Sequence, residues 1–416
     1  MPRAQGRIHR DGLTATATVL VAALEAAQQD TETADTLTHP FHTYPARLHP
    51  ATAKILVELV GEGAGRTQPI LDPFCGSGTV LVEARAASHR TIGVDLNPLA
   101  TLIARAKTWT APPRRRRELV ETAHNLAAAT LAAGKAARRG ASDINASAAP
   151  LRKVRGFDPN ARNRRLASWF APHVRRELED LSARLDELRP RDAELAAILT
   201  ACLSAILYKV SSRTSDTDAT WVDRNIARGQ PARLFAQRVD LLAAGLADLA
   251  ASHAPLPEIF ELDVRKLASV IPDGSVAGVI TSPPYAGTYD YAEHQRLRFD
   301  FLGLHHRNFD EGEVGSRRAF DADPAEAHRR WKKALAGIVD RITTALAPGR
   351  LATIVLGDSV AKGRALYALD DLREALTSDV VIEAWASQER PMLGALERRA
   401  FGDRPKAEHI VALRRR

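Results

Sequence analysis

The chain has 416 residues, of which 45% are hydrophobic and 26% are charged. This balance is typical of globular proteins and excludes disorder throughout. Its two cysteines, Cys75 and Cys202, allow at most one disulfide and form no CxxC metal-binding pair, so a reducing cytoplasm is the expected location. No apolar stretch is expected to cross a bilayer, and the basic N-terminus lacks a following apolar segment of signal-peptide type, so export is not expected.

The formal net charge of +8 is unevenly distributed. Residues 111–250 hold 24 Lys+Arg and 16 Asp+Glu, a difference of +8, and the remainder of the 58 basic and 50 acidic residues balances at 34 against 34. Within this segment, residues 111–165 hold 13 basic and 4 acidic side chains. Such a cluster suits a phosphate backbone, although a solvated, arginine-rich surface explains it equally well.

Short apolar runs alternate with helical patterns, which is the signature of a parallel sheet flanked by helices. Because the connector 387–406 is polar and rich in arginine, no helix is expected there, and the last strand is predicted to return antiparallel at the sheet edge. Seven strands are predicted, at 69–74, 91–96, 259–264, 276–282, 350–358, 380–385 and 409–414. Helices are predicted between most of them, at 78–87, 98–107, 325–346 and 366–376.

The gap between the second and third predicted strands is too long for a single crossover. Leucines at 178, 181, 185 and 188 are spaced for one apolar helix face. Residues 193–210 are apolar on nearly every side, which predicts a buried helix, and residues 234–249 again show helical spacing. We therefore predict a basic helical insertion at 111–250, a candidate target-recognition region. It separates the first part of an α/β domain, 1–110, from its second part, 251–416.

The stretch ILDPFCGSGTVLVEA predicts a strand that ends at Asp72, a turn with Gly76 and Gly78, and a helix that begins near Thr79. Glycine allows positive φ and close approach of a ligand, and a helix N-terminus presents free N–H groups. The next strand ends at Asp95, where a carboxylate can accept hydrogen bonds from ribose hydroxyls. A turn that binds no ligand is the alternative, and the pair of features favours a cofactor.

The chain has neither a GxGxxG fingerprint nor a GxxxxGK[ST] loop, which disfavours a nicotinamide cofactor or ATP. The carboxylate of Asp72 would repel a polyphosphate and attract an ammonium group. A ligand with an α-amino group and an adenosine ribose is implied, and S-adenosylmethionine meets both conditions.

Three stretches, DPFCGSGT, GVDLNPLA and TSPPY, resemble the S-adenosylmethionine-dependent DNA amino-methyltransferases, which methylate exocyclic nitrogens of cytosine or adenine. The stretch HTYPARLHP resembles the family segment that completes the methionine pocket. The resemblance implies a class I methyltransferase, Rossmann-like sheet of seven strands with the last one antiparallel. It covers about two thirds of the chain and leaves the insertion unassigned. It implies that the cofactor-binding residues are Tyr44, Pro45, Asp72, Phe74, Gly76, Gly78, Thr79, Asp95, Asn97 and Asp263. Asp263 has an equally weighted alternative role as a strand-end cap.

The stretch TSPPY follows the strand that ends at Thr281, so residues 282–285 are expected on the ligand side of the sheet. Consecutive prolines remove two N–H donors, and the loop presents carbonyl oxygens. The Ser282 hydroxyl and the Pro283 carbonyl can accept the two hydrogens of an exocyclic amino group, and Tyr285 offers a face on which a flipped base can stack. We predict that Ser282, Pro283, Pro284 and Tyr285 form the catalytic loop, with a rigid turn as the alternative.

An amino group on an aromatic base is a poor nucleophile, so the site must orient it and stabilise the charge that develops. Methylation at cytosine C5 would need a Pro-Cys nucleophile, and neither cysteine follows a proline. No metal is expected. In the family, Ser at the first position usually accompanies cytosine N4 targets and Asp or Asn accompanies adenine N6, so the resemblance favours cytosine in double-stranded DNA. An RNA substrate and a catalytically silent binding protein stay as alternatives. Candidate contacts with nucleic acid are Arg114, Arg115, Arg116, Arg117, Arg213 and Arg317.

Overall fold

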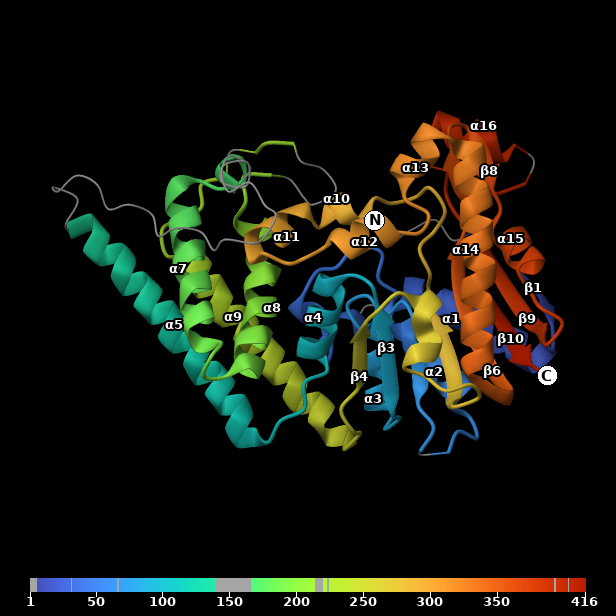
Figure 1. The fold of residues 1–416 in the computed structure, drawn as a ribbon, viewed down its shortest axis with the longest axis horizontal. Coiled ribbons are helices and arrows are strands. Elements are labelled where there is room, and N and C mark those ends of the chain that lie inside the picture. The colour runs from blue at the N-terminus through green and yellow to red at the C-terminus, as the bar shows by residue number, and fades with distance from the viewer. Residues whose placement is uncertain are drawn as a thin grey trace.

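The computed structural model describes residues 6–416 apart from 31, 66, 140–165, 214–219, 223, 393 and 403. Its main sheet has eight strands in the order β1-β9-β10-β6-β5-β2-β3-β4. In Figure 1 the strands lie in the right half of the view, and the mainly green helices of the segment between β3 and β4 lie in the left half. The strands are β1 (Ile8–Gly12), β2 (Ile70–Asp72), β3 (Thr91–Asp95), β4 (Glu258–Glu261), β5 (Val276–Thr281), β6 (Leu346–Gly357), β9 (Val380–Glu389) and β10 (Ala407–Arg415).

The sheet has the class I methyltransferase, Rossmann-like topology that the sequence predicted. Strands β4, β3, β2, β5 and β6 are parallel neighbours, and β10 runs antiparallel to both β6 and β9. All seven predicted strands form. An eighth strand, β1, pairs antiparallel with β9 and was not predicted. A two-stranded hairpin of β7 (Ser359–Ala361) and β8 (Arg364–Leu366) is a further addition.

Helices cover both faces of the sheet because its central strands are apolar on both sides. Ile70 and Ile280 pack against α1 (Thr14–Gln29) and α2 (Pro50–Gly61), whereas Leu71 and Val279 face the opposite layer. That layer contains α14 (Pro324–Ala345) and α15 (Ala368–Glu374), and Figure 1 shows α14 in front of the strands. The remaining helices around the sheet are α3 (Thr79–Ala86), α4 (Pro98–Lys107), α10 (Tyr291–His294), α11 (Arg296–Leu302), α12 (Arg307–Gly312), α13 (Arg317–Ala322) and α16 (Ala395–Phe401).

The chain between β3 and β4 is mainly helical, as expected for the insertion. Its helices α5 (Pro113–Arg139), α7 (Pro172–Leu188), α8 (Ala193–Ile206) and α9 (Gln230–Leu249) share one core with α4 and α11. The predicted face of α7 is buried at Leu178, Leu181 and Leu185. Residues 140–165 of the basic stretch 111–165 lie outside the described residues.

Two expectations about the end of the chain are wrong. A short helix, α16, lies between β9 and β10, where none was expected. Strand β10 inserts between β6 and β9 instead of lying at the edge, since its alternating Ile410 and Val411 are buried on both faces. The edge beside β9 belongs to β1.

One stretch, Ala193–Val210, is long and apolar enough to cross a membrane by length and composition, contrary to the sequence expectation. In the fold 72% of it is buried. A core helix passes the same test, and the packing of α8 against α4, α7 and α9 explains its apolar character.

Candidate active site

Three pockets meet at the carboxyl ends of the central strands. The glycine-loop pocket, with an empty volume of about 760 Å³, is lined by Gly76, Asp95, Asp263, Ser282 and Pro284 among others. An inner pocket of about 380 Å³ and an outer pocket of about 1400 Å³ adjoin it. Ser282 and Ala46 line all three pockets. The glycine loop and the SPPY loop therefore face one connected space.

The glycine loop has the backbone that its sequence indicated. Gly76 has φ +49° and Gly78 has φ +82°, both in the left-handed region that favours glycine. Gly78 is also the N-cap of α3, and a Cβ there would lie 3.1 Å from the Cβ of Ala104. Gly76 lines the pocket, whereas Gly78 serves the close packing of α3 on α4.

Asp95 holds the glycine loop in place from the end of β3. Its carboxylate accepts hydrogen bonds from the backbone N–H of Gly76 at 2.8 Å and of Asn97 at 2.8 Å. Burial raises the pKa of Asp95 to about 6. A carboxylate has about four lone-pair sites, so Asp95 keeps acceptor capacity on the pocket side for a ribose.

Asn97 and Tyr44 form the wall next to Asp95. The Asn97 side-chain oxygen accepts from the N–H groups of Leu99 and Ala100 and so caps α4, and its amide donates to the Tyr44 hydroxyl at 3.1 Å. Asn97 thus serves chiefly to cap α4 and to orient Tyr44. Both residues line the glycine-loop pocket together with Pro45 and Phe74.

The segment that carries Tyr44 is braced by the helical insertion. His42 Nε2 lies 3.0 Å from the Ser204 hydroxyl on α8, and Arg238 on α9 donates to the Pro40 carbonyl at 3.3 Å. The insertion therefore shapes one wall of the glycine-loop pocket, a role that its sequence did not indicate.

Asp263 lines the glycine-loop pocket and also caps the helical turn Val264–Ser269 that follows β4, which is the alternative role predicted from the sequence. Its Oδ1 accepts from the Arg265 N–H at 2.9 Å, and its carboxylate forms an ion pair with the Arg265 guanidinium. Burial opposes ionisation, but the bonds from Arg265 prevail and lower the pKa of Asp263. The carboxylate is therefore ionised and partly committed to Arg265.

The inner pocket has a polar lining suited to the amino-acid end of S-adenosylmethionine. Asp72, Ser77 and Thr79 line it at the N-terminus of α3. The hydroxyls of Ser77 and Thr79 are buried without a hydrogen-bond partner, and buried polar groups are rarely left so. Burial raises the pKa of Asp72 to about 7. These residues fit a zwitterionic ligand because Asp72 can bind its ammonium and the hydroxyls can donate to its carboxylate.

Cofactor affinity is expected to rise with pH through about pH 7. In the ligand-free protein Asp72 is protonated below this value, and an ammonium group binds only the ionised form. Affinity should therefore fall by up to about tenfold per unit below pH 7. Calorimetric titration with S-adenosylmethionine between pH 6.5 and 8 measures this slope, and Asp72→Asn is the control that should remove it. A slope that persists in Asp72→Asn would assign the effect to another group, such as Asp95.

The SPPY loop, the candidate catalytic loop, directly follows the end of β5. Ser282 and Pro284 face the glycine-loop pocket, and Ser282, Pro283 and Tyr285 face the outer pocket. The Tyr285 hydroxyl donates to Glu408 at 3.2 Å. Burial raises the pKa of Tyr285 well above its ordinary value, so this hydroxyl stays protonated.

The roof of the glycine-loop pocket, formed by α10 to α13, was not predicted. In Figure 1 these helices lie above the upper ends of the strands, and Phe309, Gly312 and Glu313 line the pocket from this side. Glu313 accepts from the Tyr291 N–H at 2.7 Å and pairs with Arg318 at 3.2 Å. Its raised pKa, caused by burial, marks a carboxyl that the sequence could not show to be internal.

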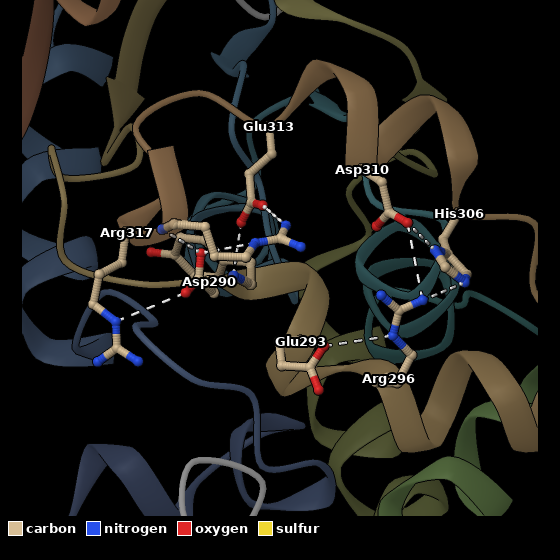
Figure 2. Close-up of polar contacts among 9 residues, drawn as sticks. Asp290, Glu293, Arg296, His306, Asp310, Glu313 and Arg317 are labelled. Atoms are coloured by element: carbon tan, nitrogen blue, oxygen red, sulfur yellow. Dashed lines mark hydrogen bonds and ion pairs between the residues drawn. The ribbon is translucent and has the colours of Figure 1, made fainter. Parts of the chain in front are cut away.

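A second group of ion pairs connects the helices of the same roof. Figure 2 shows Asp290 near Arg317, and His306 and Arg296 around Asp310. Asp290 lies 3.7 Å from the Arg317 Nε, and His306 Nδ1 lies 2.8 Å from Asp310. These contacts link the roof helices to one another beside the catalytic loop.

The candidate nucleic-acid contacts are scattered. Arg114 to Arg117 lie at the start of α5, which is near the lower edge of the view in Figure 1, and they line none of the three pockets. Arg115 pairs there with Asp192 and Glu118, and Arg116 donates to the Ala111 carbonyl. Arg213 lies over the Trp169 ring at 5.5 Å, within the insertion. Of the set, Arg317 contacts the segment that follows the SPPY loop: its backbone N–H donates to the Tyr289 carbonyl at 3.1 Å, and its side chain is 60% exposed.

Both cysteines are buried and free, Cys75 in the glycine loop and Cys202 on α8. Among the described residues, no three His, Cys, Asp or Glu side chains are grouped as metal ligands.

Residues 40–154 match a family model described as an RMKL-like methyltransferase domain. This match agrees with the class I methyltransferase fold of the sheet. It is 42% identical over 77 residues to the Type II methyltransferase M.MvaI of Kocuria varians, a match that covers 18% of this chain and 17% of that protein. It is 43% identical over 54 residues to the tRNA (guanine(10)-N2)-dimethyltransferase of Methanothermobacter thermautotrophicus, covering 13% and 16%. These matches span less than a fifth of either relative.

Two solved structures align with most of the chain at low similarity. TrmN from Thermus thermophilus has a TM-score of 0.33 at 10% identity, covering 91% of this chain and 52% of that one. The rRNA methyltransferase aviRa from Streptomyces viridochromogenes has a TM-score of 0.29 at 14% identity, covering 93% and 94%.

Proposed function

We propose that the protein transfers a methyl group from S-adenosylmethionine to an exocyclic amino group of a base in double-stranded DNA, with cytosine N4 as the favoured target. The observation that carries the proposal is the position of Ser282, which lines the glycine-loop pocket, the inner pocket and the outer pocket. A base held in the outer pocket can present its amino group to the glycine-loop pocket past this side chain, because Ser282 lines both pockets, together with Ala46 and Tyr291.

The residues have distinct tasks in this reaction. S-adenosylmethionine, when bound, supplies an electrophilic methyl group. Asp95 and the glycine loop bind the nucleoside end, and Asp72 with Ser77 and Thr79 binds the amino-acid end. The Ser282 hydroxyl and the Pro283 carbonyl accept the two amino hydrogens, which turns the nitrogen lone pair out of conjugation with the ring. Orientation of this lone pair is the main contribution of the protein to the rate.

The flipped base needs a stacking surface, and the outer pocket offers aromatic side chains. Tyr285, Tyr289 and Tyr291 all line it. Arg47, His49 and Arg390 add hydrogen-bond donors to the same wall. An edge rich in acceptors, such as N3 and O2 of cytosine, is complementary to such donors, which supports cytosine over a base that presents a ring N–H donor.

The direct test is to express the chain in a host without DNA methylation, digest the DNA to nucleosides and measure N4-methylcytosine and N6-methyladenine by mass spectrometry. N4-methylcytosine is the expected product. N6-methyladenine alone would move the target to adenine, and the absence of both from the host and from methylation reactions in vitro would contradict the proposal.

RNA is the second candidate substrate, favoured by the similarity to a tRNA (guanine(10)-N2)-dimethyltransferase, whose name also specifies an exocyclic amino target. Transfer of labelled methyl groups from the cofactor to total RNA and not to DNA would establish this alternative. A catalytically silent binding protein, the third alternative, would bind nucleic acid without transferring label to either.

Arg317 is expected to contact a DNA phosphate, because its side chain is exposed and its backbone contacts the segment that follows the SPPY loop. Arg317→Ala should lower the slope of log affinity against log salt by about one. The matched control is Arg114→Ala, an exposed arginine that lines none of the three pockets, which should leave the slope unchanged. Fluorescence anisotropy with a labelled duplex measures both slopes. If both variants lowered the slope equally, the start of α5 would have to be part of the nucleic-acid interface.

A further inference from the structure

Two residues that are neighbours on adjacent strands of the sheet hold the side chain of Tyr285. Glu408 on β10 is the register partner of Gly357 on β6. The Tyr285 hydroxyl donates to Glu408 Oε1 at 3.2 Å. A Cβ built on Gly357 would lie 2.4 Å from the Tyr285 ring. The ring therefore rests on bare backbone at Gly357 while its hydroxyl is tied to the neighbouring strand.

Glu408 is itself fixed by a third residue. Its Oε2 accepts from the Arg390 guanidinium, which follows the end of β9. The side chains of Glu408 and Arg390 are 29% and 18% exposed, so the pair forms part of the pocket wall. A carboxylate paired with a half-buried arginine keeps a defined rotamer and so a defined acceptor position.

These residues belong to the outer pocket, where the target base is proposed to bind. Tyr285, Gly357, Arg390 and Glu408 all line it. The hydroxyl bond fixes the far end of the ring and so restrains the first side-chain torsion of Tyr285, and contact with Gly357 restrains rotation of the ring about its own axis. A stacking surface that is already oriented spares the entropy of ordering it when the base arrives.

We propose that Glu408 is a positioning residue that orients the Tyr285 ring as the stacking surface for the target base, with Arg390 holding Glu408 in its acceptor rotamer. This inference rests on the proposed function, because it assigns the ring a base to stack on. It gives the reversed strand β10 a role in substrate binding that neither the sequence motifs nor the comparisons indicate.

The kinetic test compares Glu408→Ala, Tyr285→Phe and the double variant, using a duplex that the wild-type protein methylates. Each single variant should lower kcat/KM for DNA by about tenfold, and the double variant should lose less than the product of the two single losses because both changes break the hydrogen bond between Tyr285 and Glu408. Glu408→Gln, which keeps an acceptor oxygen, should restore most of the activity. Cofactor affinity, measured by calorimetry, should be unchanged. A double variant with multiplied losses, or a fully active Glu408→Ala, would overturn the inference.

The matched control is Asp370→Ala. It also removes a carboxylate that pairs with an arginine of the segment before β10, namely Arg404, but it lines none of the three pockets described above. It should retain wild-type kcat/KM.

A second readout needs no substrate. With ¹³C-labelled tyrosine, the ring signals of Tyr285, assigned by their loss in Tyr285→Phe, should report one fixed ring position in the wild-type protein and shifted, exchange-broadened signals in Glu408→Ala, where the first side-chain torsion is freed. Unchanged ring signals would refute the positioning role whatever the reaction is. A wild-type protein that methylates no nucleic acid would instead refute the proposed function, so the two failures are distinct.

Discussion

Replacing Ser282 with alanine is expected to lower the rate of methyl transfer by about 100-fold or more while cofactor affinity stays unchanged. The hydroxyl lines all three pockets and is one of two acceptors proposed for the amino hydrogens. Loss of one preorganised polar contact at a reacting group typically costs two to three orders of magnitude in kcat. Single-turnover transfer of labelled methyl groups to DNA measures the chemical step, and calorimetry measures cofactor binding.

Ser275→Ala is the matched control for this experiment. Ser275 stands just before β5 and Ser282 just after it, so the two serines bracket the same strand. The Ser275 hydroxyl donates to the Pro272 carbonyl in a solvent-exposed hydrogen bond, and Ser275 lines none of the three pockets. This variant should keep full activity. If Ser282→Ala also kept full activity, the Pro283 carbonyl alone would have to orient the amino group, and the role assigned to Ser282 would be withdrawn.

The central strands were predictable because their physical signals are local. The stretches ILD and VAGVIT are continuous apolar runs that end where a polar loop begins, and such runs mark strands buried on both faces. Gly76 and Gly78 could be recognised because their positive φ values require glycine at that turn. Strand β1 was missed because its IHRDG sequence is mostly exposed and owes its structure to pairing with β9.

The roof of the glycine-loop pocket could not be predicted because the burial of its charged residues depends on contacts between helices and not on the local sequence. Glu313 and Asp290 look like surface charges in the sequence, and only the packing of α10 to α13 turns them inward. The arginines at 114–117 show the converse. Their charge is plain in the sequence, but charge does not indicate at which end of a sheet a segment will lie, and these arginines line none of the three pockets.

The helical insertion has both a feature that local sequence predicts and a feature that it does not. Its helices were predictable from apolar periodicity, but its contacts with Pro40 and His42 were not, because they link residues more than 150 positions apart. These contacts brace the segment that leads to Tyr44, which lines the glycine-loop pocket and the inner pocket. A segment first considered for target recognition therefore also braces one wall of the glycine-loop pocket.

Asp95→Ala is expected to weaken binding of S-adenosylmethionine by about 100-fold. The substitution removes the acceptor for the ribose and also leaves the N–H groups of Gly76 and Asn97 without their partner. Each hydrogen bond to a charged group contributes about 1.5–3 kcal/mol, and loss of the contact to Gly76 also releases the backbone that faces the ligand. Asp95→Asn, which keeps one acceptor oxygen, should show an intermediate loss.

Glu261→Gln provides the control, because Glu261 is the register partner of Asp95 on β4 and lines none of the three pockets. It should bind the cofactor as the wild type does. Burial already disfavours the charge of Asp95, as its pKa of about 6 indicates, so Asp95→Asn should not lower the melting temperature through loss of that charge. Calorimetry and thermal unfolding of the same samples therefore separate a binding defect from unfolding. Unaltered cofactor affinity in Asp95→Ala would contradict the proposal that Asp95 binds the ribose in the glycine-loop pocket.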